Sequence, residues 1–292
     1  MFKQYCQERC KLIDQQLAKL MQSNNVHEAV IFDAMQYSLF AGGKRLRPLL
    51  LMAAADAVGG NGQKYLRIAC GLEMIHTYSL IHDDLPAMDN DDYRRGKLTN
   101  HKVFGEGIAI LAGDGLLTHA FDVMLSQTEV KPSRLIQVIR EISNAAGPCG
   151  MVGGQAVDLV SEGKILDHET VKFMHQAKTG ALFKAAIRAG ALLSDTDDVK
   201  LAALTKFADC FGLAFQITDD ILDVVGNQDK IGKPIGSDIR NQKATYVTLY
   251  SLEEAQKMAR QVVDEALDTL RGFGPEAEML RNFITYLLAR EN

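Results

Sequence analysis

The chain has 292 residues, 47% of them hydrophobic, and a formal net charge of −5. This length and apolar content supply a substantial core, in one large domain or two smaller ones. The small negative charge comes without a clustered basic surface, which excludes general nucleic-acid binding. The five cysteines are an odd number and form no Cys-x-x-Cys pair, which indicates unpaired thiols in a reducing compartment.

The N-terminal segment and the hydropathy pattern predict a soluble, cytoplasmic protein. MFKQYCQERCKLID at 1–14 is charged throughout and lacks the apolar centre of a signal peptide. No run reaches the ~18 apolar residues that a membrane span needs. We therefore expect no membrane-spanning segment.

Apolar residues at three- and four-residue spacing predict helices along most of the chain. In the first half, the expected helices are 4–22, 27–40, 48–58, 63–84, 103–127 and 132–146. AGGKRLRP at 41–48 breaks this pattern, and Pro48 suits the first turn of the helix that follows. GGNG at 59–62 closes that helix.

In the second half, the glycine-rich stretch 147–154 ends where another helix begins. Further helices are expected at 168–193, 199–225, 251–271 and 275–290. Residues 226–243 form a polar, basic loop, long enough to indicate either function or disorder. The pattern predicts a single all-α domain over 1–292, a helical bundle with a buried centre.

Leu80–Asp92, with the sequence LIHDDLPAMDNDD, contains five Asp in thirteen residues directly after an apolar helix. Crowded carboxylates repel one another, and a hard cation is the usual reason to tolerate them. Ligand sets made only of oxygen suit Mg²⁺ or Ca²⁺ rather than zinc. Pro86 disfavours a continuous helix, so we expect the helix to end there and the loop to fold Asp89 back toward Asp83.

A second acidic cluster lies in QITDDILD. Asp219 and Asp223 are four residues apart, which places both carboxylates on one helix face, and Asp220 flanks them. Each cluster lies near the C-terminal end of an apolar helix, where the helix dipole favours cations. Either cluster alone could be a solvated helix terminus. Two clusters with the same placement favour a metal site, and we expect them to face each other.

Basic residues accompany both clusters. In GGKRLRP, Lys44, Arg45 and Arg47 precede a helix start, where free N–H groups attract anions. This is not a Walker P-loop, because GxxxxGK[ST] is absent. Other basic residues follow the acidic loop or lie in or near other breaks: Arg94, Arg95, Lys97, Lys178, Lys233 and Lys243. Paired carboxylates beside paired arginines suit a polyphosphate bridged by Mg²⁺.

Glu73 and His76 form a Glu-x-x-His pair, a spacing found in di-iron helical bundles, but the second pair that such a site needs is missing. His76 precedes Asp83 by two helical turns and could donate to a phosphate there. The alternative is a histidine that only packs in the core. Nucleophilic catalysis has little support, because no GxSxG motif is present.

Together these segments resemble the trans-prenyltransferases (polyprenyl diphosphate synthases), and among them the bacterial farnesyl diphosphate synthases. The resemblance covers nearly the whole chain, and the set of motifs in this order is highly specific. The motifs are GGKRLRP at 42–48, HTYSLIHDDLPAMDNDDYRRGK at 76–97, NHKVFGE at 100–106, AILAGD at 109–114, GGQAVDL at 153–159, KTGALF at 178–183, FQITDDILD at 215–223 and GKPIGSD at 232–238.

The resemblance implies helices around a deep central cavity, a homodimer, and Mg²⁺-dependent head-to-tail condensation of isopentenyl diphosphate with dimethylallyl or geranyl diphosphate. It implies that Mg²⁺ is held by Asp83, Asp84, Asp89, Asp219, Asp220, Asp223 and Asp158. Arg94, Lys178 and Lys233 would bind the allylic diphosphate, and Lys44, Arg47, His76 and Arg95 would bind isopentenyl diphosphate. Thr179 and Gln216 would face the developing carbocation.

Tyr78 and Ser79 bear on product length, because they lie about one helical turn, ~5.4 Å, before Asp83. A tail anchored at Asp83 would meet the Tyr78 ring, and in relatives an aromatic residue here goes with short products. We therefore expect the fifteen-carbon farnesyl product. The spacing DDxxxxD is shared with plant-type geranylgeranyl diphosphate synthases, so it does not decide product length.

Three alternatives remain. A geranylgeranyl diphosphate synthase has the same fold. A terpene cyclase needs no isopentenyl diphosphate site, so GGKRLRP argues against it. A non-catalytic subunit of a longer-chain synthase would be expected to lose its metal-binding Asp residues, and both clusters are intact here.

Overall fold

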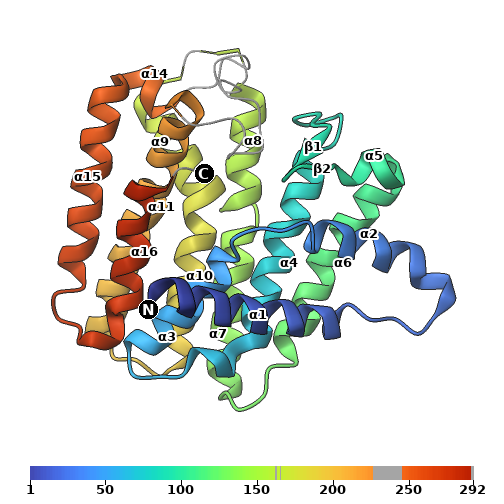
Figure 1. Cartoon of the computed structure of the whole chain (residues 1–292), viewed down its shortest axis with the longest axis horizontal. Coiled ribbons are helices and arrows are strands. Elements are labelled where there is room, and N and C mark those ends of the chain that lie inside the picture. The colour runs from blue at the N-terminus through green and yellow to red at the C-terminus, as the bar shows by residue number, and fades with distance from the viewer. Residues whose placement is uncertain (162, 165, 226–244, 291–292) are drawn as a thin grey trace. The chain divides into compact units, whose positions relative to one another are not determined.

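A computed structural model describes residues 1–161, 163–164, 166–225 and 245–290. Helices make up nearly all of the elements in these residues, which confirms the predicted all-α fold (Figure 1). The chain divides into two compact units. Unit 1 is Met1–Leu49 with Gln63–Leu135, and unit 2 is Leu50–Gly62 with Ile136–Asn292. The single domain expected from the sequence remains a prediction.

Unit 1 is centred on α4, which packs chiefly on α6 and also contacts α1 and α2. Figure 1 shows α4 and α6 side by side. Buried residues lie on every side of α4, as expected for a helix at the centre of a core. The elements of unit 1 are α1 (Phe2–Leu20), η1 (Val26–Glu28), α2 (Ala29–Leu39), the start of α3 (Leu46–Ala57), η2 (Gly62–Tyr65), α4 (Leu66–Asp83), β1 (Tyr93–Arg94), β2 (Lys97–Leu98), α5 (Asn100–Phe104) and α6 (Glu106–Leu125).

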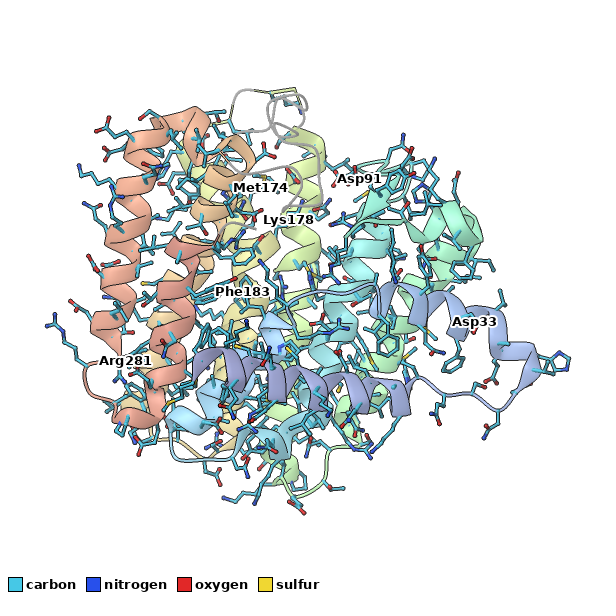
Figure 2. All side chains as sticks on the ribbon, viewed as in Figure 1. Asp33, Asp91, Met174, Lys178, Phe183 and Arg281 are labelled. Atoms are coloured by element: carbon cyan, nitrogen blue, oxygen red, sulfur yellow. The ribbon has the colours of Figure 1, made fainter. Side chains whose placement is uncertain are left out.

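Unit 2 is centred on α11, which packs on α10 and α15. The ring of Phe183, marked in Figure 2, meets the ring of Phe211 edge-on at 5.2 Å, and this pair anchors α10 to α11. The elements of unit 2 are the rest of α3, all but the first turn of α7 (Pro132–Ala146), α8 (Met151–Ser161), α9 (His168–His175), the π-helix η3 (Gln176–Gly180), α10 (Ala181–Leu193), α11 (Asp198–Val225), α14 (Tyr246–Tyr250), α15 (Leu252–Thr269), η4 (Pro275–Ala277) and α16 (Glu278–Ala289).

Three local features differ from the expected helices. Strands β1 and β2 form a short antiparallel hairpin where only a loop was expected. The helix expected over 103–127 is split into α5 and α6 at Gly105, whose φ of +83° no helix accommodates. The helix expected over 168–193 contains the five-residue π-helix, a widening that is rare and is often found at functional sites.

Helix α6 is the one helix, among the described residues, that is long and apolar enough to cross a membrane, whereas the sequence pattern predicted no such segment. Length and composition alone are weak evidence, because core helices of folded domains pass the same test. Ala109, Leu116 and Ala120 of α6 are fully buried, and α6 packs along α4. Packing in the core of unit 1 therefore explains part of the apolar character of α6.

Candidate active site

The acidic cluster of unit 1 is formed where α4 ends. The helix stops at Asp83, as Pro86 led us to expect. The backbone N–H of Asp89 then donates to the backbone carbonyl oxygen of Asp83 at 2.9 Å, which confirms that the loop folds back. Two residues six apart in sequence are thereby brought to the same end of one helix.

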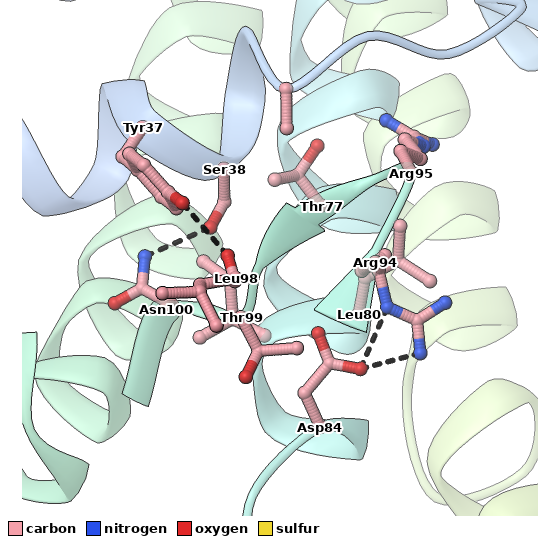
Figure 3. A pocket seen from close by; sticks show the side chains of 12 residues that line it. Tyr37, Ser38, Thr77, Leu80, Asp84, Arg94, Arg95, Leu98, Thr99 and Asn100 are labelled. Carbon is pink, nitrogen blue, oxygen red and sulfur yellow. Dashed lines mark hydrogen bonds and ion pairs between the residues drawn. The ribbon is translucent and has the colours of Figure 1, made fainter. Parts of the chain in front are cut away.

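Asp84 pairs with Arg94. Its Oδ1 accepts a hydrogen bond from Nε of Arg94 at 2.7 Å and forms an ion pair with Nη2 at 2.5 Å. Asp84 is buried, and the pair lines a small cavity of about 20 Å³ in unit 1 (Figure 3). Burial lowers the pKa of Arg94, but the hydrogen bond and charge of Asp84 outweigh it and leave the pKa raised. Arg94 therefore stays charged, and Nη1 carries two further N–H donors.

The hairpin that presents Arg94 and Arg95 is held to its neighbours in unit 1. The hydroxyl of Tyr37 donates to the carbonyl oxygen of Leu98 at 2.8 Å (Figure 3). The hydroxyl of Thr99 donates to the carbonyl oxygen of Asp91 at 2.8 Å. These bonds fix a hairpin that has only two residues in each strand and would be marginal alone.

Arg95 joins the hairpin to the GGKRLRP segment. Its Nη1 donates to the carbonyl oxygen of Gly42. A Cβ built on Gly43 would lie 2.6–2.8 Å from the Arg95 guanidinium, and Gly43 has a φ of +123°. Glycine at position 43 is therefore required by the backbone conformation, whereas a larger residue there would also shift the end of the Arg95 side chain.

His76 lies within a group of arginines, which brings together three of the residues expected to bind isopentenyl diphosphate: Arg47, His76 and Arg95. Burial, followed by the charges of Arg47 and Arg95, lowers the pKa of His76 well below its usual value. Burial also lowers the pKa of Arg47 to about 10, although Glu73 acts in the opposite direction. His76 is thus neutral at physiological pH, within a strongly positive region suited to an anion.

Arg45 has a structural role, which corrects its grouping with the anion-binding residues. It is 4% exposed, and its Nε donates to Asp14 at 2.9 Å. Its Nη1 donates to buried Glu73 at 2.9 Å, and its Nη2 donates to the carbonyl oxygen of Leu39 at 2.8 Å. Glu73 therefore balances the charge of Arg45 within unit 1. Lys44, one residue earlier, is exposed.

Tyr78 and Ser79 differ in environment. Tyr78 is 6% exposed, and its ring meets His82 edge-on at 5.7 Å. Burial and then the charge of Asp83 raise the pKa of Tyr78, so the two side chains lie within electrostatic reach. Ser79 donates to the carbonyl oxygen of His76 in its own helix at 2.9 Å. Of these two residues, Tyr78 is therefore the one whose bulky side chain fills space near Asp83.

The site residues of unit 2 gather around the π-helix. Lys178 pairs with Asp158 of α8 at 2.6 Å, and both are largely buried. The Thr179 hydroxyl donates to Oε1 of Gln216 on α11 at 3.2 Å. Figure 2 marks Lys178 one turn beyond Met174. The π-helix thus places two consecutive polar side chains against two different helices.

Asp219, Asp220 and Asp223 all lie on α11, as the spacing predicted. Buried Asp220 accepts from Nε2 of Gln216 at 2.8 Å and from the backbone N–H of Tyr246 at 2.7 Å. Asp219 is exposed and pairs with Arg290 at 2.5 Å. No sequence signal pointed to the partners Tyr246 and Arg290, because both lie far along the chain outside any motif.

These carboxylates fit Mg²⁺. Among the described residues, no three His, Cys, Asp or Glu side chains come together closely enough to hold a metal ion alone. Mg²⁺ does not require such a group, since it keeps several waters and is commonly bound by one or two carboxylates plus substrate phosphates. Asp83 and Asp89, whose backbones meet at one helix end, and Asp219 and Asp223, one turn apart on α11, each supply the one or two carboxylates that such a site uses.

Two residues expected to bind phosphate, Lys233 and Lys243, lie outside the described residues. The other expected residues form two groups. Unit 1 contains Lys44, Arg47, His76, Asp83, Asp84, Asp89, Arg94 and Arg95, and unit 2 contains Asp158, Lys178, Thr179, Gln216, Asp219, Asp220 and Asp223.

Comparison with known proteins gives consistent matches. The family model described as polyprenyl synthetase matches residues 28–282. The chain is 45% identical over 290 residues to a geranylgeranyl diphosphate synthase of Cyanophora paradoxa, covering 99% of this chain and 96% of that one. It is 49% identical over 261 residues to a farnesyl diphosphate synthase of Geobacillus stearothermophilus, covering 89% and 88%. A crystal structure of an FPP/GFPP synthase from Zymomonas mobilis, 37% identical, superposes with a TM-score of 0.88 over 98% of each chain.

Proposed function

Because the chain belongs to the polyprenyl synthetase family and is a trans-prenyltransferase, we propose that it makes farnesyl diphosphate. It joins isopentenyl diphosphate head-to-tail to dimethylallyl diphosphate and then to geranyl diphosphate. The observation that carries this proposal is the end of α4, where Asp83 and Asp89 are folded together beside the Asp84–Arg94 pair. Adjacent carboxylates and arginine suit a metal-bound diphosphate.

The allylic diphosphate must leave as its C–O bond breaks, so the residues around it must stabilise negative charge. Mg²⁺, when bound by the Asp residues, supplies part of that stabilisation. Arg94 donates to the diphosphate oxygens through its remaining N–H groups while Asp84 holds its guanidinium in place. Lys178 does the same, with its ammonium group oriented by Asp158, and Lys233 and Lys243 are proposed as further contacts.

The second substrate, isopentenyl diphosphate, binds through Lys44, Arg47, His76 and Arg95. The low pKa of His76 keeps its imidazole neutral, so it donates a hydrogen bond without adding charge. The double bond of isopentenyl diphosphate attacks the allylic cation, which Thr179 and Gln216 face through their oxygen atoms. The diphosphate released in the first step takes up the proton that is then lost.

The proposal also specifies the number of carbons in the product. Buried Tyr78, within reach of the charge on Asp83, is the residue that limits the growing tail. The relatives are named both farnesyl and geranylgeranyl diphosphate synthases, so the twenty-carbon product is the second candidate. Ser79 adds little bulk, and its hydroxyl is turned to its own helix.

We also propose a cytoplasmic homodimer. Helix α6 exposes large apolar side chains, with Ile110 at 45%, Leu111 at 54% and Leu125 at 60%. An exposed apolar stripe on a helix favours burial against another protein surface. A second copy of the chain is the partner that the family resemblance implies.

The proposal is tested by incubating the purified protein with Mg²⁺, dimethylallyl diphosphate and isopentenyl diphosphate, and sizing the products by mass spectrometry. A dominant fifteen-carbon product supports the proposal. A dominant twenty-carbon product would instead establish the second candidate.

A further inference from the structure

The π-helix that carries Lys178 and Thr179 lies between two glycines of unit 2. A Cβ built on Gly154 of α8 would lie 2.7 Å from Cα of Lys178 and still closer to its backbone nitrogen. A Cβ built on Gly212 of α11 would lie 2.9 Å from Cα of Gly180. Interiors are close-packed, so backbone atoms at this distance leave no room for a methyl group. Any larger residue at either position must displace the π-helix.

Each glycine lies one helical turn before a polar partner of the π-helix. Gly154 and Asp158 are four apart on α8, and Gly212 and Gln216 are four apart on α11. Residues at this spacing share a helix face. On α8 and on α11, the glycine that allows close approach of the π-helix therefore lies on the same helix face as the side chain that pairs with it. Asp158 meets Lys178, and Gln216 meets Thr179.

Glycine within a helix is less favourable than alanine, because it loses more conformational freedom on folding. Gly154 and Gly212 both lie inside helices. The contacts with the π-helix give a reason for glycine at both positions. A π-helix is itself rare and frequently marks a functional site.

We propose that Gly154 and Gly212 are positioning residues for prenyl transfer. Their two contacts set the distance of the π-helix from α8 and α11, and so hold Lys178 against Asp158 and Thr179 against Gln216. Gly154 acts through Lys178 on binding of the allylic diphosphate, and Gly212 acts through Thr179 on its ionisation. This inference rests on the proposed roles of Lys178 and Thr179.

The test compares alanine variants of three glycines. Gly154→Ala is expected to raise KM for the allylic diphosphate, and Gly212→Ala to lower kcat with KM for isopentenyl diphosphate unchanged, each on the order of tenfold. Gly190→Ala is the matched control. Its Cβ would lie 2.9 Å from the backbone nitrogen of Ala55, an equally close backbone contact within unit 2, but ten residues beyond Gly180. It is expected to lower the thermal midpoint and leave kcat and KM unchanged.

Two further measurements separate positioning from a general loss of stability. In a Thr179→Val background, Gly212→Ala should cause no additional loss of kcat, since its effect passes through Thr179. A crystal structure of Gly212→Ala should show Thr179 and Gln216 beyond the ~3.5 Å limit of a hydrogen bond, whatever its activity.

Additive losses in the double variant, or an equal fall in kcat in Gly190→Ala, would overturn the inference. An active wild-type protein whose glycine variants keep wild-type kinetics would refute this inference alone. A wild-type protein that transfers no prenyl group would refute the proposed function, and this inference with it.

Discussion

The backbone N–H of Asp89 donates a hydrogen bond to the backbone carbonyl oxygen of Asp83 at 2.9 Å. A carbonyl at the end of an α-helix has no partner within the helix, and here the loop that follows supplies one. The bond holds the loop around Pro86 so that two carboxylate-bearing residues start from neighbouring backbone positions. A spacing of six residues, which no regular helix would place on one face, thus brings two Asp backbones together at one helix end.

Asp83→Ala should lower kcat by about 10³-fold, because the charge on the leaving diphosphate loses its metal-mediated stabilisation. KM for isopentenyl diphosphate should change little. Steady-state kinetics with both substrates varied checks this. Asp92→Ala is the control, since Asp92 belongs to the same acidic loop but pairs with Lys102 at the surface. Equal losses in turnover and in isopentenyl diphosphate binding would count against the role given to Asp83.

Tyr78→Ala should lengthen the main product from fifteen to twenty carbons or more. Removing the buried ring opens space one turn, ~5.4 Å, from Asp83, close to the length of one isoprene unit. Mass spectrometry of the products checks this, with Tyr78→Phe as the control that keeps the ring. If Tyr78→Ala made the same product as wild type, the ring would only pack the core.

Glu73→Gln should destabilise unit 1, because it leaves the charge of buried Arg45 poorly compensated. Breaking a buried pair of this kind costs about 3 kcal/mol, which lowers the thermal midpoint by roughly 6–12 °C. Differential scanning fluorimetry measures the shift. Lys102→Ala removes an exposed pair and should leave the midpoint nearly unchanged. An unshifted midpoint in Glu73→Gln would show that Asp14 alone suffices for Arg45.

His175 should make the protein less stable in acid. Burial lowers its pKa from 6.5 to about 4. Between these values the unfolded chain binds the proton and the folded chain does not, so stability falls as pH drops from about 6.5 to 4, by roughly 3 kcal/mol in full. In His175→Asn the thermal midpoint should therefore decline less steeply across this range. His27→Asn, at an exposed position, is the control for the substitution itself.

Much of the fold follows from apolar spacing, because a helix that buries one face shows that face in the sequence. Helix α4, which is buried on every side, shows a nearly continuous apolar run instead. The helix predicted over 132–146 matches α7, and Pro86 correctly marked the end of α4. The hairpin of Tyr93–Leu98 was missed because two-residue strands have no periodicity of their own. Its stability comes from Tyr37 and Thr99, which lie outside it.

The sequence predicted which residue types form the site. It did not predict which side chains pair with one another. Arg45 looked like an anion-binding residue because its partner Glu73 is 28 residues away and gives no local signal. The π-helix at Gln176–Gly180 packs closely against Gly154 and Gly212, and no pattern within KTGALF shows these contacts. Pairings of this kind are properties of the packed chain and cannot be deduced from spacing.

The most direct test of the proposed reaction is incorporation of radiolabelled isopentenyl diphosphate into an extractable prenyl product by the wild-type protein. We expect incorporation only when both Mg²⁺ and an allylic diphosphate are present, and its loss on addition of a chelator. A folded protein that incorporates no label under these conditions would contradict the proposed function.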